Sequence, residues 1–155
     1  MFKWYMQNGT TSESNYPYEN SLYRGIQGYC DIDMDTLDKG VVKDAGAAKD
    51  YDSMKDVMSR GPTVGSFAID SNVFSFYSSG VIQAYDSNCL TVGQNPNHQM
   101  AVVALDTTGS SPYWLIQNSW GTDWGEGGFA KFEVNDAGGY GTCSMYIDGL
   151  QWVET

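Results

Sequence analysis

The chain has 155 residues, of which 41% are hydrophobic and 14% are aromatic, and its formal net charge is −11. This length is enough for a domain with a buried core, and the apolar content excludes an intrinsically disordered chain. No apolar run approaches the roughly 20 residues that a membrane-spanning helix needs. Nucleic acids and anionic membranes are polyanions, so the negative charge disfavours both as partners. We therefore expect a soluble protein with no nucleic-acid partner and no membrane partner.

The local patterns predict few helices and several strands. Gly9 is expected to stop a first helix, Asp50 or Asp52 to cap a second, and Gly61-Pro62 to end it. In chain order, the expected elements are the last turns of a helix over 1–9, a short strand over 41–43, a helix over 52–59, a strand-like stretch over 63–69, a short helical turn over 73–77, and strands over 99–106, 113–117, 129–134 and 145–147. Regular strands after one helix favour an antiparallel sheet or barrel with a helix on one side.

The cysteine count is odd. Cys30, Cys89 and Cys143 are widely spaced and His98 is the only histidine, so we expect no metal site of the Cys/His kind. In an oxidising compartment, one disulfide can form and one cysteine is left over. The remaining cysteine can pair with another chain, act as a reactive thiol, or lie buried as an inert one.

Any nucleophilic catalysis that depends on histidine must use His98, which lies in a polar loop just before an apolar strand. The alternative interpretation is an ordinary surface-loop histidine. Asn118 ends another apolar strand, where it can accept a hydrogen bond from an imidazole N–H while a neighbouring indole shields that bond from water. The alternative there is a turn rich in glycine and tryptophan that only packs. The chain contains no G-x-S-x-G, P-loop or G-x-G-x-x-G motif.

Four motifs, taken together and in this order, resemble the papain-like cysteine proteases. They are SNYPYE (14–19), the GP…FAID…FYSSGV stretch (61–81), NHQMAVVALD (97–106) and YWLIQNSWGTDWGEGGFAKF (113–132). The resemblance implies an α+β, papain-like fold: an antiparallel, β-barrel-like right domain with a short helix, plus the tail of the helical left domain. It places residues 1–30 at the end of the helical domain and crossover loop, and residues 31–155 in the β-rich domain.

The resemblance also implies roles for individual residues. His98 matches the histidine that activates the nucleophilic cysteine, and Asn118 the asparagine that orients this histidine. Trp120 matches the indole that covers the pair, and Trp124 the second aromatic residue of the same wall. In such enzymes a thiolate–imidazolium pair hydrolyses peptide bonds of peptide and protein substrates. No cofactor is implied, and the expected location is lysosomal, vacuolar or secreted.

The chain departs from the family pattern at the nucleophile. The motif that carries the catalytic cysteine, similar to Q-G-x-C-G-S-C-W, is absent. We therefore expect the C-terminal, His/Asn-bearing portion of a cysteine peptidase. Its nucleophile would come from an N-terminal papain-like chain or segment, and the isolated chain is expected to be inactive. The alternative is a non-catalytic or structural relative, in which serine can replace the nucleophile; the unusual Gln99 and the acidity lean this way.

The resemblance assigns the cysteines and a substrate pocket. Cys89 and Cys143 match a pair that bridges the β-rich domain, whereas Cys30 matches a cysteine whose partner lies in the helical part, so it is expected to be inter-chain or free. The pocket residues implied are Ala68, Pro96 and Asn97, with Asp148 at the floor. An acid at that position favours a basic substrate side chain; the alternative for Asp148 is a solvated turn residue.

Overall fold

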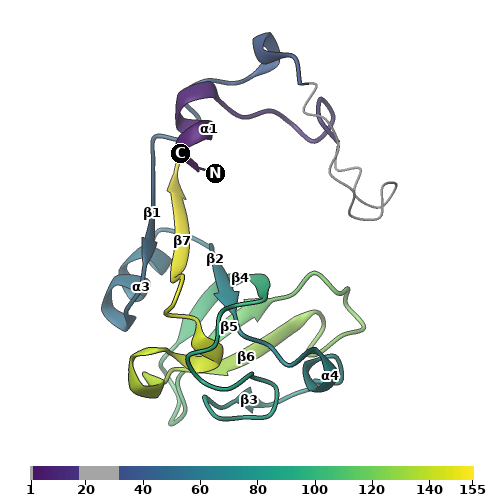
Figure 1. Cartoon of the computed structure of the whole chain (residues 1–155), viewed down its shortest axis with the longest axis vertical. Helices are drawn as coiled ribbons and strands as arrows, with labels where there is room; N and C mark the ends of the chain where they lie inside the picture. Colours follow the sequence, from purple (N-terminus) through teal and green to yellow (C-terminus); the bar gives the residue numbers. More distant parts are fainter. Residues whose placement is uncertain (1, 18–31) are drawn as a thin grey trace. The chain divides into compact units, whose positions relative to one another are not determined.

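The structure is a computed structural model that describes residues 2–17 and 32–155 (Figure 1). The chain divides into two compact units, residues 1–45 with 153–155, and residues 46–152. The domain boundary expected between residues 30 and 31 lies outside the described residues. Within the described part of the chain, no helix is long and apolar enough to cross a membrane.

The first unit contains helix α1 (Phe2–Asn8) and the 3₁₀ turn η1 (Met34–Thr36). Gly9 ends α1 with a φ of 103°, and its amide donates to the Tyr5 carbonyl at 2.8 Å. A Cβ at this position would lie 2.7 Å from the Asp38 carbonyl oxygen, so only glycine fits. Thr10 and Asp38 exchange backbone hydrogen bonds of 3.1 and 2.7 Å next to this turn. The predicted helix over 1–9 with a glycine stop is confirmed.

A seven-stranded sheet with the order β1-β7-β2-β4-β5-β6-β3 organises the second unit (Figure 1). Strand β2 pairs antiparallel with β7 and β4, and β5 pairs antiparallel with β4 and β6, whereas β3 joins β6 in parallel. The expected antiparallel sheet is thus confirmed for all of these pairs except the short last one. The strands are β1 (Asp44–Ala48), β2 (Thr63–Phe67), β3 (Val81–Ile82), β4 (His98–Asp106), β5 (Tyr113–Gln117), β6 (Phe129–Glu133) and β7 (Leu150–Glu154).

Two short helices accompany the sheet, α3 (Tyr51–Met58) and α4 (Ser71–Phe74). Asp50 caps α3, since its side chain accepts from the Ser53 amide at 2.9 Å, and the Ser53 hydroxyl accepts from the Asp50 amide at 3.3 Å. This reciprocal bonding decides between the two caps expected for this helix in favour of Asp50. Helix α4 is one turn long and begins two residues before the helical turn expected at 73–77.

The short strand expected over 41–43 is wrong. The strand begins instead at Asp44 and has the sequence DAGAA, which has little intrinsic preference for a strand. Gly46 explains its composition: a Cβ there would lie 2.8 Å from the indole of Trp152, a β7 residue, so the bare glycine backbone makes room for this ring. Pairing with β7 thus outweighs the intrinsic strand preference of Val41 and Val42, where the strand was expected.

The strand expected over 145–147 is also wrong. Residues 142–149 form the 3₁₀ turn η3 (Thr142–Ser144) and further turns, and the last strand starts at Leu150. The Met145 amide donates to the Thr142 carbonyl at 3.2 Å, and the Ile147 amide to Ser144 at 3.1 Å. Met145 is fully buried, so the apolar pattern reflects burial of a turn and not strand formation.

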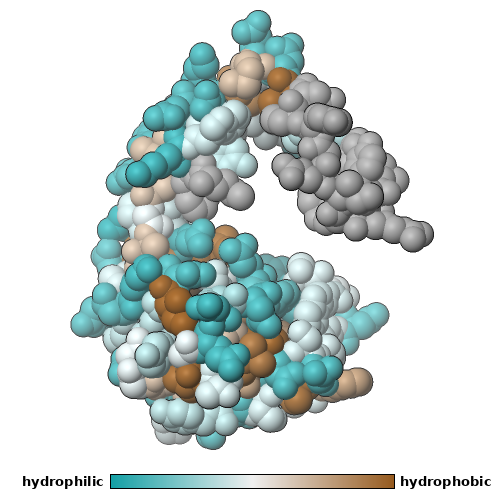
Figure 2. Space-filling view, viewed as in Figure 1, coloured by the Kyte–Doolittle hydropathy of each residue, from teal (hydrophilic) through white to brown (hydrophobic). Residues whose placement is uncertain are grey.

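One hydrophobic core fills the second unit. Phe67 of β2 and Phe132 of β6 meet edge to face with ring centroids 5.1 Å apart. On the face in view in Figure 2, apolar residues of this unit surface as separate patches among hydrophilic ones. The largest fully buried side chains belong to Trp114, Phe67, Phe74, Phe132, Met54, Ile69 and Ile116.

Burial of Tyr146 in this core predicts a loss of stability in alkali. Burial raises the pKa of Tyr146 to about 12, with a smaller contribution from the charge of Asp136. The folded-state pKa lies above the ordinary value of about 10. The stabilisation that the neutral Tyr146 side chain contributes is therefore complete below pH 10 and is lost as the pH rises toward 12. We expect Tyr146→Phe to lose less unfolding free energy than the wild type between pH 9 and pH 11, measured by denaturant titration; equal losses in both proteins would contradict this.

Candidate active site

The sheet brings His98 and Asn118 to one edge. His98 is the first residue of β4, and Asn118 directly follows β5. These strands are antiparallel neighbours, with Ala101 opposite Gln117, so the start of one lies beside the end of the other. His98 Nε2 and Asn118 Oδ1 are 3.0 Å apart. Two residues separated by 20 positions in the chain thus form one hydrogen-bonded pair.

The direction of this hydrogen bond defines the histidine tautomer. An amide oxygen can only accept, so His98 Nε2 carries the hydrogen and donates to Asn118. The amide group cannot be turned round, because the same Asn118 oxygen also accepts from the Ser119 amide at 2.8 Å. Nδ1 is then the ring nitrogen left to exchange a proton with a reacting group. Asn118 is 8% exposed, which limits competition by water for the bond.

Tryptophans cover the pair. The Trp120 ring lies 5.1 Å from the His98 ring, tilted by 36°, and Trp124 meets Trp120 edge to face at 5.6 Å. Trp120 is 40% exposed and forms the outer wall, whereas Trp124 is buried and its Nε1 donates to the Phe74 carbonyl at 3.0 Å. The structure therefore brings together His98, Asn118, Trp120 and Trp124.

Phe74 is a site residue that the sequence analysis did not single out. Its fully buried ring lies 4.8 Å from Trp124, 5.6 Å from Trp120 and 6.5 Å from His98, measured between centroids. It reaches them from α4, so the helix supports the aromatic wall from behind. The aromatic run around residues 74–77 is the sequence signal that points to this segment, but it does not distinguish Phe74 from its neighbours.

A carboxylate ties the segment after α4 to the loop after β5. Glu126 Oε1 accepts from the Gly80 amide at 3.0 Å, and its Oε2 lies 2.6 Å from Lys131 Nζ. The Lys131 ammonium keeps the pKa of Glu126 below its usual value, despite some desolvation. Tyr77 donates from its hydroxyl to the Gly80 carbonyl at 2.7 Å, and its burial raises its pKa to about 12. The two segments that carry the aromatic wall are thereby braced against each other.

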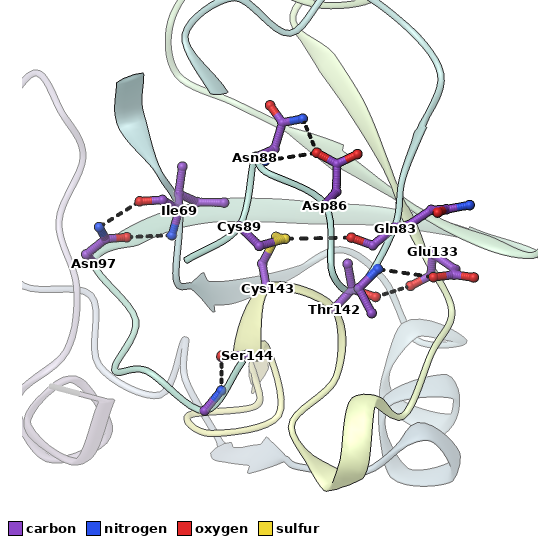
Figure 3. Close-up of a disulfide and its surroundings, with 12 residues drawn as sticks. Ile69, Gln83, Asp86, Asn88, Cys89, Asn97, Glu133, Thr142, Cys143 and Ser144 are labelled. Carbon is purple, nitrogen blue, oxygen red and sulfur yellow. Dashed lines mark hydrogen bonds between the residues drawn. A yellow bond between two sulfur atoms is a disulfide. The ribbon is translucent and has the colours of Figure 1, made fainter. Parts of the chain in front are cut away.

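Among the residues expected to form a substrate pocket, hydrogen bonds hold Asn97 next to Ala68, whereas those among the described residues join neither of them to Asp148. Asn97 Oδ1 accepts from the Ile69 amide at 2.8 Å and its Nδ2 donates to the Ile69 carbonyl at 2.9 Å, so the side chain holds the backbone next to Ala68 (Figure 3). Pro96 precedes Asn97 and is half-buried. Asp148 lies exposed in the turn before β7, and among the described residues no hydrogen bond or ion pair joins it to Ala68 or Asn97.

Cys89 and Cys143 are joined by a disulfide, the pair that the resemblance implies (Figure 3). The bond lies beside the segment that follows β2. The Ala68 amide donates to the Cys143 carbonyl at 2.7 Å, and the Leu90 amide donates to the Ala68 carbonyl at 2.9 Å. Cys30 lies outside the described residues. Within residues 2–17 and 32–155, no group of three or more His, Cys, Asp or Glu side chains is arranged to hold a metal ion.

Comparison with known proteins identifies the family. The family model described as "Papain family cysteine protease" matches residues 1–150. The chain belongs to the papain family of cysteine proteases. It is 34% identical to vignain of Phaseolus vulgaris and 31% identical to the KDEL-tailed cysteine endopeptidase CEP2 of Arabidopsis thaliana. In both comparisons the alignment covers 90% of this chain and 36% of the relative, so the chain spans little more than a third of their length.

Solved structures of cysteine proteases share this fold. The digestive procathepsin L 3 of Tenebrio molitor larval midgut superposes with a TM-score of 0.75 at 25% identity, over 99% of this chain and 47% of that structure. The cysteine protease CMS1MS2 of Carica candamarcensis, solved with E-64, has a TM-score of 0.73 at 22% identity, over 99% of this chain and 66% of that one. The expected α+β, papain-like fold is confirmed.

Proposed function

We propose that the chain is the C-terminal, His/Asn-bearing part of a cysteine peptidase that hydrolyses peptide bonds. The nucleophilic cysteine would come from a papain-like chain or segment outside these 155 residues. The observation that carries the proposal is the 3.0 Å hydrogen bond from His98 Nε2 to Asn118 Oδ1 beneath the Trp120 ring. This arrangement leaves Nδ1 for proton exchange with a thiol, which is the role of a histidine in this kind of catalysis.

The proposed reaction uses Nδ1 of His98 twice. His98 takes the thiol proton, and the resulting thiolate attacks the peptide carbonyl carbon. The imidazolium then protonates the leaving amine, which breaks the C–N bond and leaves an acyl-enzyme. In the second half, a water molecule gives a proton to Nδ1 and its oxygen displaces the thiolate from the acyl carbon. Asn118 keeps the ring in one orientation through both steps, because its oxygen accepts from Nε2 in the neutral and the protonated ring alike.

The first unit supplies a contact surface for the other polypeptide in this proposal. Its large apolar side chains are exposed at Trp4 (42%) and Met34 (47%). A cavity of about 710 Å³ lies in the same unit and is lined in part by Trp4, Ile32 and Leu37. Burial of such a surface against the rest of a helical domain would be favourable. Cys30 would form the covalent link, and the disulfide within the chain supports a vacuolar, lysosomal or secreted location.

Reconstitution tests the proposal. We expect the purified chain alone to hydrolyse no fluorogenic peptide, and activity to appear when it is combined with the polypeptide that bears the nucleophilic cysteine. His98→Ala should lower kcat/KM of the complex by about 10²- to 10⁴-fold, the range for loss of an acid–base group. Asn118→Ala should mainly lower kcat and change the pH profile. Asn72→Ala, an exposed asparagine in α4, is the matched control and should leave both kinetic constants unchanged.

A thiol-reactive epoxide probe distinguishes the outcomes. In the active complex we expect the probe to label the partner polypeptide, and labelling to fall in His98→Ala because less thiolate is present. Peptidase activity of the isolated chain would contradict the external nucleophile. A complex with serine at the nucleophile position, and with neither labelling nor turnover, would support the alternative, a non-catalytic relative. The unusual Gln99 directly after His98 favours that alternative.

A further inference from the structure

A groove of about 440 Å³ lies on the outer side of the aromatic wall. One side comes from the segment that follows α4, including Phe76 and Tyr77. The other comes from the loop that follows β5, including Trp120, Asp123 and Trp124. The groove adjoins the candidate active site directly, because Trp120 contributes to the groove and also lies 5.1 Å from the His98 ring.

Aromatic rings supply the exposed surface of this groove. Phe76 is 84% exposed, the highest value among the large apolar side chains of the described residues, and Trp120 is 40% exposed. Beneath them, Tyr77 and Trp124 are 8% and 7% exposed, with ring centroids 5.5 Å apart. The Glu126 and Gly80 contacts described above hold these two segments together. The groove is therefore prebuilt, and Phe76 and Trp120 expose ring surface to it.

Among the described residues, Asp123 is the one charged residue that lines the groove. It is exposed and takes part in neither of the two ion pairs found among the described residues, which are Arg60–Asp56 and Lys131–Glu126. A cation gains energy over the face of an aromatic ring, most of all over tryptophan, and gains more when a carboxylate lies beside it. Lys and Arg side chains also carry a long apolar stem that can cover a ring such as Phe76.

We propose that this groove binds the side chain of a Lys or Arg residue in the peptide on which His98 acts. The aliphatic stem would lie on Phe76, and the charged end would lie between the Trp120 ring and the Asp123 carboxylate. The proposal rests on the proposed function, since the peptide is the substrate of the site. Asp123 and Phe76 are then specificity-determining residues that take no part in proton transfer.

Binding to the full 155-residue chain tests this proposal without any need for the nucleophile. The probes are four peptides, acetyl-Ala-X-Ala-amide, in which X is Arg, Lys, norleucine or Glu. Binding is followed by NMR from the shift of the Trp120 indole N–H. We expect the Arg and Lys peptides to bind about tenfold more tightly than the norleucine peptide, the combined effect of one exposed cation–π contact and one exposed ion pair. The Glu peptide should bind more weakly than norleucine.

Matched variants separate the groove from the overall negative charge. Asp123→Asn should reduce the preference for Arg over norleucine to about two- to fivefold, the part that the cation–π contact supplies, and Phe76→Ala should weaken binding of the Arg, Lys and norleucine peptides alike. Asp52→Asn removes the same charge from the surface of α3, and Tyr85→Ala removes an aromatic ring that is 76% exposed elsewhere; both should leave binding unchanged.

Two results would overturn the proposal. One is equal binding of the Arg and norleucine peptides to the wild-type chain. The other is an equal loss of preference in Asp123→Asn and Asp52→Asn, which would assign the effect to net charge. A failure of the proposed function appears separately, as a reconstituted complex without turnover, while the peptide preference of the chain persists. The NMR signals of His98 and Trp124 in each variant report whether the site is still folded.

Discussion

The double variant Cys89→Ala/Cys143→Ala is expected to lower the free energy of unfolding by about 4 kcal/mol. The disulfide lowers the conformational entropy of the unfolded chain by closing a loop of this size, and the variant loses that effect. The two cysteines are 54 positions apart, so the bond restricts a long segment of the unfolded chain. The same segment contains His98, Asn118 and Trp120, and the disulfide lies next to the residues that follow β2. Denaturant unfolding of the oxidised wild type and the variant measures the difference.

The wild type with a reductant is the control for this prediction. Reduced wild-type protein should unfold at nearly the same denaturant concentration as the double variant, because both lack the cross-link and retain the rest of the core. Backbone amides of residues 83–97, which connect β3 to His98, should exchange hydrogen faster in both. A variant that stays within 1 kcal/mol of the oxidised wild type would contradict the prediction and show that packing alone holds this segment.

Local rules were sufficient where an element depends on its own residues. The short apolar run YWLIQ forms β5 over the predicted range, with Trp114 and Ile116 fully buried. Gly9 ends α1 with a positive φ that glycine adopts readily and an amide that donates to the Tyr5 carbonyl, and Asp50 caps α3 through a three-residue spacing to Ser53. Each of these features is decided by neighbours a few positions apart.

Local rules failed where a partner far along the chain decides the structure. Strand β1 has a composition that disfavours strands and exists because β7 pairs with it and Trp152 lies against Gly46. Met145 and Tyr146 are residue types that suit a strand, but here they belong to a series of turns. The carbonyls of Thr142 and Ser144 accept the hydrogen bonds of these turns, and the side chains of Met145 and Tyr146 are buried. In both cases the tertiary contact outweighs the intrinsic preference.

The sequence was sufficient to predict the motif residues of the candidate site, but not Phe74, which packs against their aromatic rings. His98, Asn118, Trp120 and Trp124 stand in recognisable motifs, and the sheet then brings them together. Phe74 escaped notice because its contacts, Trp120 and Trp124, lie 46 and 50 positions away, and because Phe76 lies in the same aromatic run. The structure separates the two phenylalanines: Phe74 is fully buried, whereas Phe76 is 84% exposed.

This contrast makes Phe74→Ala and Phe76→Ala a matched pair. Phe74→Ala should lower the free energy of unfolding by about 3–5 kcal/mol, because a large side chain is removed from a fully packed position and leaves a cavity. Phe76→Ala should change it by less than about 0.5 kcal/mol, since an exposed side chain gives up little packing. Denaturant unfolding of both variants at the same pH measures the difference.

The same pair tests whether Phe74 positions the aromatic wall. Loss of its ring removes the contacts at 4.8 Å to Trp124 and 5.6 Å to Trp120, so the Trp120 ring should no longer hold a single position over His98. We expect the ring-current shift of the His98 signals to decrease in Phe74→Ala and to be preserved in Phe74→Leu, which keeps most of the buried volume, and in Phe76→Ala. A role limited to stability would lower the unfolding free energy of Phe74→Ala and leave the His98 shift unchanged below the unfolding transition. A decreased shift in the folded variant would instead mean that this buried ring, 24 positions before His98, helps to set the geometry in which Asn118 and Trp120 hold the imidazole.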